Sequence, residues 1–230
     1  MKRGTLCALA LALCLTVAAC GQRQEAAVTP SPTQTPAATP VPTPKPTPTP
    51  TPLPVFDPED PFATMPNHYL LAYGRGGWST GFTMQPDGSF SGVYVDNNMG
   101  DDDPDLYPNG TRYICSFSGQ FSRPERVDDH TYSVKIESLT LSHPDDGAEE
   151  ISEEEGVRYI YTGPYGLEDT DELLLCLPDK PASELSEDAL RAPSDRAGWK
   201  PTEAGTLGEY MLYNPAQDLV FSGVFRGEVT

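Results

Sequence analysis

A cluster of aspartates between positions 96 and 105 offers the first chemistry that residue types and spacing suggest. The candidate ligands for a metal ion are Asp96, Asp101, Asp103 and Asp105. Calcium is coordinated by carboxylate and carbonyl oxygens of flexible loops, so calcium is the ion that such a loop would bind. The spacing departs from the EF-hand pattern because Met99 and Gly100 interrupt the run. A solvated turn that ends a hairpin is the alternative interpretation.

Two cysteines, Cys115 and Cys176, are candidates for a disulfide. Both lie in apolar segments, and in an oxidising compartment a bridge between them would add roughly 4 kcal/mol of stability by the chain-entropy model. The alternative is a pair of buried thiols that pack as small apolar groups. A catalytic thiol would need a neighbouring imidazole, and His130 and His143 flank one predicted strand at opposite ends.

Two motifs of known enzyme classes are missing from the sequence. The chain has no glycine-rich phosphate loop and no H-E-x-x-H motif. A glycosidase would need two carboxylates across a cleft, but 34 acidic residues will form close pairs by chance. We therefore expect no catalytic residue and no cofactor.

The net charge and the aromatic residues limit the classes of ligand. A formal charge of −19 opposes nucleic-acid binding, which depends on Lys and Arg beside phosphates. The aromatic side chains could line a binding cavity, but filling a β core is their expected role. They are Tyr69, Tyr73, Trp78, Tyr94, Tyr113, Tyr132, Tyr159, Tyr161 and Tyr165.

The first residues, 1–19, have the pattern of a secretory signal peptide. Lys2 and Arg3 precede an almost wholly apolar run that is too short to span a bilayer comfortably. The segment Val17-Ala18-Ala19-Cys20 resembles the lipobox of bacterial lipoproteins. That resemblance implies cleavage before Cys20 and its lipidation with acyl chains such as palmitate, which anchors the protein at the extracytoplasmic face of a cell membrane. An ordinary signal peptide with an incidental cysteine is the alternative.

A Thr/Pro-rich segment follows, and we assign residues 20–61 to a disordered spacer. Eleven of the 25 prolines fall between Pro30 and Pro54. Because proline fixes φ and lacks an amide donor, such a run forms neither helix nor sheet. In the extended polyproline II conformation this tract would reach about 80 Å, which suits a stalk.

Residues 62–230 have the pattern of a single β-rich domain. An Asp87-Gly88 turn between alternating runs predicts a hairpin. A strand is predicted over 113–121, and a change of apolar parity within 131–141 predicts a bulge near Glu137 and Ser138. Further strands are predicted over 157–161, 172–177, 209–213 and 219–225, with one helix over Glu184–Arg191 capped by Ser183. We expect an all-β, mainly antiparallel barrel or sandwich with one short helix.

Two resemblances bear on this domain. Gly76-Gly77-Trp78 resembles the start of lipocalin-like barrels. The domain also resembles uncharacterised lipoproteins of clostridial-type bacteria, through the segments 87–92, 156–161 and 164–167. These lipoproteins have no assigned activity, so the resemblance implies a location and no mechanism.

The expected function is that of a membrane-anchored, non-enzymatic binding module for a small ligand, a glycan or a protein. Its bilayer contact would be made by the lipidated Cys20. The alternatives are a secreted hydrolase that uses carboxylates and an envelope-structural protein without a ligand.

Overall fold

The computed structural model describes residues 53–73, 76–144 and 147–225. These residues belong to a compact unit that spans Pro50–Thr230. The predicted signal peptide, Cys20 and most of the predicted spacer lie outside the described residues. Residues 53–61, the end of the predicted spacer, include Phe56, which packs against Tyr132 with a ring-centroid distance of 4.6 Å.

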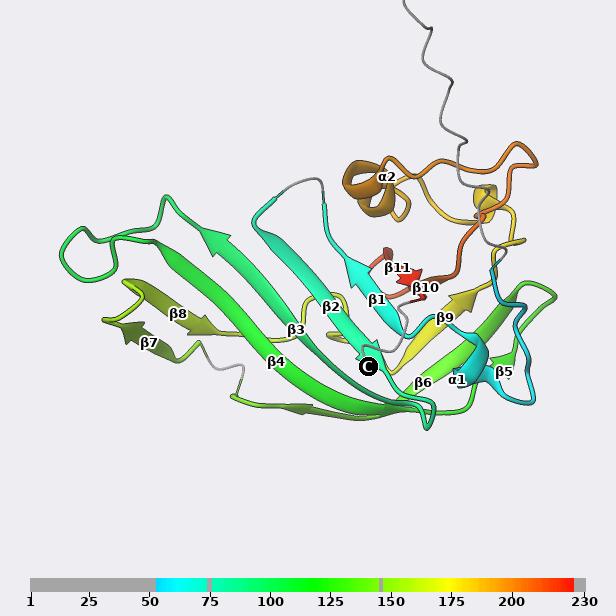
Figure 1. Ribbon diagram of the computed structural model, residues 1–230, viewed down its shortest axis with the longest axis horizontal. Coiled ribbons are helices and arrows are strands. Elements are labelled where there is room, and N and C mark those ends of the chain that lie inside the picture. Colours follow the sequence, from blue (N-terminus) through cyan, green and yellow to red (C-terminus); the bar gives the residue numbers. More distant parts are fainter. Residues whose placement is uncertain (1–52, 74–75, 145–146, 226–230) are drawn as a thin grey trace, which may run out of the picture. The chain divides into compact units, whose positions relative to one another are not determined.

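An antiparallel β-barrel forms the centre of this unit (Figure 1). Around the ring, its strands follow the order β6-β9-β10-β11-β1-β2-β3-β4, and the pairing of β4 with β6 closes it. The strands are β1 (His68–Leu71), β2 (Trp78–Met84), β3 (Ser89–Asn98), β4 (Thr111–Phe121), β6 (Thr131–Leu141), β9 (Glu172–Cys176), β10 (Met211–Asn214) and β11 (Leu219–Val224). The predicted fold class is therefore confirmed.

Three further strands lie outside the ring. The short β5 (Glu125–Arg126) pairs with β6. The hairpin of β7 (Glu149–Ser152) and β8 (Val157–Tyr161) continues the sheet beyond the end of β6. Strand β4 pairs with both β8 and β6 along the same edge. Residues 111–114 pair with β8, and residues 117–121 pair with β6.

The predicted bulge in β6 is confirmed at Glu137. Gln120 pairs with Ser138 and Phe121 pairs with Ile136, so Glu137 is an extra residue on the β6 side. An extra residue transfers the following side chains to the other face, which explains the change of parity in the sequence. Strand β6 pairs with β9 over residues 131–135 and with β4 from Ile136 onward.

The helix predicted over Glu184–Arg191 is wrong in its position. The structure has a 3₁₀ helix at Ala182–Glu184 and an α-helix, α2, at Arg191–Ala197, in addition to α1 at Pro61–Thr64. Leu185 interrupts the predicted helix with an extended backbone, and Ser186 rather than Ser183 accepts a hydrogen bond from the following turn, at Ala189 N. In the described part of the chain, no helix is long and apolar enough to cross a bilayer.

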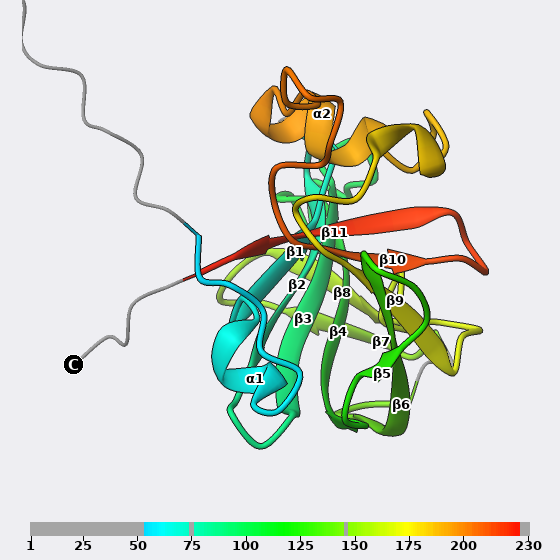
Figure 2. The ribbon, with the colours of Figure 1, turned by 90° about the vertical axis from the view of Figure 1, so that its right-hand side faces the viewer.

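Side chains fill the barrel interior, and a second apolar cluster covers the barrel from outside. Phe82 and Phe121 lie 5.9 Å apart between ring centroids, and Phe90 stacks on Phe121 at 4.2 Å. The outer cluster contains Cys176 and Met211, and the segment that leads to α2 passes outside β10 and β11 (Figure 2). The interior cluster also contains some of the tyrosines named in the sequence analysis. Core filling, one of the two roles considered for those aromatic residues, therefore applies to part of them.

Candidate functional site

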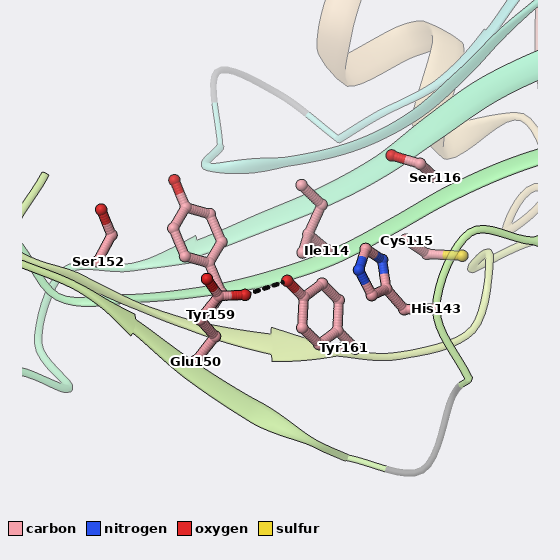
Figure 3. Close-up of a pocket in the computed structure, with 8 residues that line it drawn as sticks. All are labelled: Ile114, Cys115, Ser116, His143, Glu150, Ser152, Tyr159 and Tyr161. Atoms are coloured by element: carbon pink, nitrogen blue, oxygen red, sulfur yellow. Dashed lines mark hydrogen bonds between the residues drawn. The ribbon is translucent and has the colours of Figure 1, made fainter.

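The candidate site is a groove at the junction where β6 ends and β8 adjoins β4. Its volume is about 260 Å³. The residues that line it come from β4, β7, β8 and the loop after β6 (Figure 3): Ile114, Cys115, Ser116, His143, Glu150, Ser152, Tyr159 and Tyr161. Pockets that enclose a drug-sized ligand hold roughly 300–1,000 Å³. The groove therefore suits one ring, or one residue of a longer ligand.

The strand register places the two groove tyrosines on one face of the sheet. Strands β4 and β8 run parallel, with Tyr159 beside Arg112 and Tyr161 beside Ile114. Side chains alternate between faces along a strand, so Arg158 projects from the opposite face. On the far side of β8, Glu150 of β7 pairs with Tyr159 and joins the same face. The face continues the outer surface of the barrel, because Phe117 and the other odd residues of β4 point inward.

Tyr161 is held between a carboxylate and an imidazole. Its hydroxyl donates a hydrogen bond to Glu150 Oε2 at 2.7 Å, and the His143 ring stacks on its ring at 4.0 Å between centroids (Figure 3). The hydrogen bond to Glu150, with a smaller contribution from burial, raises the pKa of Tyr161. The phenol therefore stays protonated at neutral pH and keeps its hydrogen bond.

Tyr159 is fixed by a second polar chain. Its hydroxyl donates to Glu155 and accepts from Arg112 Nη1 at 3.3 Å. Arg112 in turn donates from Nε to Asn97 Oδ1 at 2.7 Å, and its guanidinium lies 5.5 Å from the centroid of the Tyr159 ring. The hydrogen bond to Glu155 is the main cause that raises the pKa of Tyr159. Both tyrosines thus have anchored hydroxyls and partly exposed rings.

The chemistry of the groove favours binding. Cys115 lines it, but this residue is only 3% exposed and belongs to the interior cluster, so its thiol is not presented to solvent. Ser152 Oγ accepts a hydrogen bond from the backbone of Glu155 in the β7–β8 turn. The groove-lining groups that remain for a ligand include the rings of Tyr159 and Tyr161, the His143 imidazole and the Glu150 carboxylate.

The predicted aromatic set divides by position. Tyr69 and Tyr132 are buried in the core. Tyr73, Trp78, Tyr94 and Tyr165 form a half-buried cluster on the opposite face from the groove, with Trp78 at 5.2 Å from both Tyr73 and Tyr165 between centroids. Burial, with the nearby Asp96 charge, raises the pKa of Tyr94 to about 12. Only Tyr159 and Tyr161 of the predicted set line the groove.

The predicted calcium ligands are not brought together. Asp101 forms an ion pair with Arg158, and Asp103 Oδ1 accepts from the amides of Asp105 and Leu106 within a turn. Asp96 lies on β3 opposite Trp78. Within the described residues, no group of three or more His, Cys, Asp or Glu side chains could hold a metal ion. Asp101, Asp103 and Asp105 lie in the connection between β3 and β4.

The candidate disulfide is not formed. Cys115 and Cys176 are separate buried thiols, one in the interior cluster and one in the outer cluster. Cys176 pairs with Thr131 at the start of β6, whereas Cys115 lies beyond the pairing of Phe117 with Leu141 at the end of β6. The length of β6 between these points is on the order of 30 Å of strand, far more than the ~7 Å between Cα atoms that a bridge allows.

The buried thiol of Cys176 should make stability fall in alkaline solution. Burial is the main cause that raises its pKa from 9.0 to about 12. The unfolded chain then releases this proton first, so the stabilisation is complete below pH 9 and is lost as pH rises toward 12. Between pH 9 and 10, the free energy of unfolding should fall in the parent by about 1 kcal/mol more than in Cys176→Ala. Urea titrations at the two pH values measure this difference. Equal losses in both proteins would contradict the assignment.

Most groove residues were missed from the sequence. The strand predicted over 157–161 is confirmed as β8, but its tyrosines were not assigned to a site. No local signal joined Tyr159 to Arg112, because this contact depends on the pairing of β8 with β4. The contact of Tyr161 with Glu150 depends on the β7–β8 hairpin, and β7 was not predicted. His143 was considered only as a partner for a cysteine.

Comparison with models of protein families, with curated proteins and with solved structures finds no match. The function is therefore argued from the geometry and chemistry of the groove.

Proposed function

We propose that this protein is a non-enzymatic binding module and that the groove between β4, β7 and β8 binds one sugar residue of a glycan. The observation that carries the proposal is the pair of tyrosines on one sheet face, with hydroxyls fixed by Glu150 and Glu155 and rings partly exposed. A sugar ring has apolar C–H faces that pack on aromatic rings. Its hydroxyl groups can donate to carboxylates around the rim.

The proposal includes the location inferred from the sequence. A lipidated Cys20 would anchor the chain at the extracytoplasmic face of the membrane, and the Thr/Pro-rich spacer would let the domain reach glycans at a distance from the lipid. Support for this comes from the signal-like leader and the residues before Cys20. Mass spectrometry of the protein isolated from membranes tests it, because a chain that starts at an acylated Cys20 is the expected product.

Loss of the Tyr161 ring should weaken glycan binding about tenfold or more. Tyr161→Ala removes one aromatic face and the hydroxyl held by Glu150, and about 1.4 kcal/mol of lost interaction corresponds to tenfold in affinity. Calorimetric titration with soluble fragments of bacterial cell-wall glycans measures the effect. The proposal fails if the parent protein binds none of these fragments.

Tyr113→Ala is the matched control. Tyr113 is also partly buried, but it lies on β4 opposite Ile160, on the other sheet face. We expect this variant to bind the fragments as the parent does. Equal weakening by Tyr113→Ala and Tyr161→Ala would mean that the two changes act through the stability of the sheet and not through the groove.

One specific feature favours the competing hydrolase function. Two carboxylates, those of Glu150 and Glu155, lie beside the groove tyrosines. Such an enzyme would release new reducing ends from the glycan, and Glu150→Gln would abolish the release while the fold stays intact. We expect no release by the parent protein. Turnover that depends on Glu150 would replace the binding module with a glycosidase.

A further inference from the structure

The second half of β6 has a sheet edge that no strand of the described residues covers. Strand β9 pairs with β6 only over residues 131–135, and the bulge at Glu137 follows directly. From Ser138 to Leu141, β6 pairs with β4 on one side. No strand among the described residues pairs with the other side, and the end of β6 lies at the border of the sheet (Figure 1).

The register identifies the backbone groups on this edge. Ser142 N donates to Ser116 O, so alternate residues Thr140 and Ser138 also form their hydrogen bonds with β4. The amide and carbonyl groups of Leu139 and Leu141 therefore point away from β4. Within the described part of the chain, none of these groups has a hydrogen-bond partner across the edge. An extended peptide could form up to four backbone hydrogen bonds there.

A groove of about 710 Å³ runs along this edge. Its other wall is the loop of residues 164–171, and the partly buried Leu139 and Leu141 supply apolar surface. Four carboxylates lie among the lining residues, and no Lys or Arg does: Glu137, Glu168, Asp169 and Asp171. Glu137, Asp169 and Asp171 are exposed. The groove thus combines unsatisfied backbone groups with negative charge.

We propose that this groove binds an extended, basic peptide segment of a partner protein as an added β-strand along Leu139 and Leu141. Backbone hydrogen bonds to a sheet edge give such complexes their affinity, and side-chain pockets give specificity. Alternate side chains of an added strand point to opposite faces, so lysines on one face would meet the carboxylates and apolar residues would meet the leucines. This site is separate from the tyrosine groove, and neither proposal depends on the other.

The test uses the purified full chain and an end-capped hexapeptide of alternating lysine and valine. Added peptide should protect the Leu139 and Leu141 amides from hydrogen exchange, as measured by NMR. Leu139→Pro removes one edge donor without breaking a bond to β4, and we expect peptide affinity to fall about tenfold. The same peptide with N-methylated valines should also bind about tenfold more weakly.

Ile151→Pro is the matched control, because Ile151 is an apolar residue of the edge strand β7, whose amide also points away from its one partner strand. This variant should bind the peptide as the parent does. Asp169→Lys tests the charge without touching a strand, and it should weaken binding several-fold. Absence of binding to the parent chain, equal affinity for the N-methylated peptide, or an unchanged affinity in folded Leu139→Pro would each overturn the proposal.

Discussion

Replacing Gly119 with alanine is expected to lower the free energy of unfolding by about 3 kcal/mol. A Cβ at Gly119 would lie 2.2 Å from the backbone oxygen of Ser138 and 2.5 Å from Cζ of Phe90. Gly119 pairs with Leu139 just beyond the bulge, where β4 and β6 close the barrel. The carbonyl belongs to the sheet itself and cannot move aside as a flexible side chain could. The strain must therefore spread into the strand pairing that closes the ring.

Urea denaturation followed by tryptophan fluorescence measures this loss, as a lower midpoint with an unchanged slope. Gly100→Ala is the control, because a Cβ there has no contact closer than 3.7 Å and its backbone is not in the left-handed region. We expect its midpoint to stay within error of the parent. A Gly119→Ala midpoint equal to that of Gly100→Ala would mean that the barrel is not closed at this point.

Local patterns predicted the strands and the bulge, because these features depend on residues that are neighbours in sequence. The Asp87-Gly88 turn fixes the hairpin of β2 and β3, and the parity change in β6 identifies Glu137 within one residue. The helix was misplaced because Ser183 offered a cap, whereas Leu185 is buried in the outer cluster and takes an extended backbone. The α-helix begins only at Arg191, with no side-chain cap.

The groove could not be predicted in this way, because its walls meet through long-range pairing. Arg112 and Tyr159 are 47 residues apart and come together only because β8 adds in parallel to β4. The same pairing separates Asp101 from the other candidate calcium ligands, since Arg158 of β8 forms an ion pair with it. A sequence shows which carboxylates are near one another along the chain, but not which cation neutralises them.

Asn214→Ala should also cost about 3 kcal/mol, through buried hydrogen bonds and not through strain. The Asn214 side chain is fully buried. Its Nδ2 donates to Gly166 O at 2.9 Å, and its Oδ1 accepts from the amides of Ala216 and Gln217 at 2.9 and 3.3 Å. Alanine would leave the buried Gly166 O without this donor, and the amides of Ala216 and Gln217 in the partly exposed turn after β10 without their acceptor. The segment around Gly166 would also loosen, and with it Tyr165, which contacts Trp78 at 5.2 Å between ring centroids.

A control variant and a fluorescence measurement separate the loss of buried hydrogen bonds from a general loss of packing. Asn109→Ala is the matched control, because the Asn109 side chain donates a similar hydrogen bond to Glu155 O at 2.7 Å but is exposed. Loss of this exposed bond should cost less than about 1 kcal/mol. Asn214→Ala should in addition change the native fluorescence of Trp78 before unfolding begins, whereas Gly119→Ala should not. Similar losses for both asparagines would imply that water reaches Asn214. The segment at Gly166 would then be held chiefly by the bond from Thr80 Oγ1 to Tyr165 O.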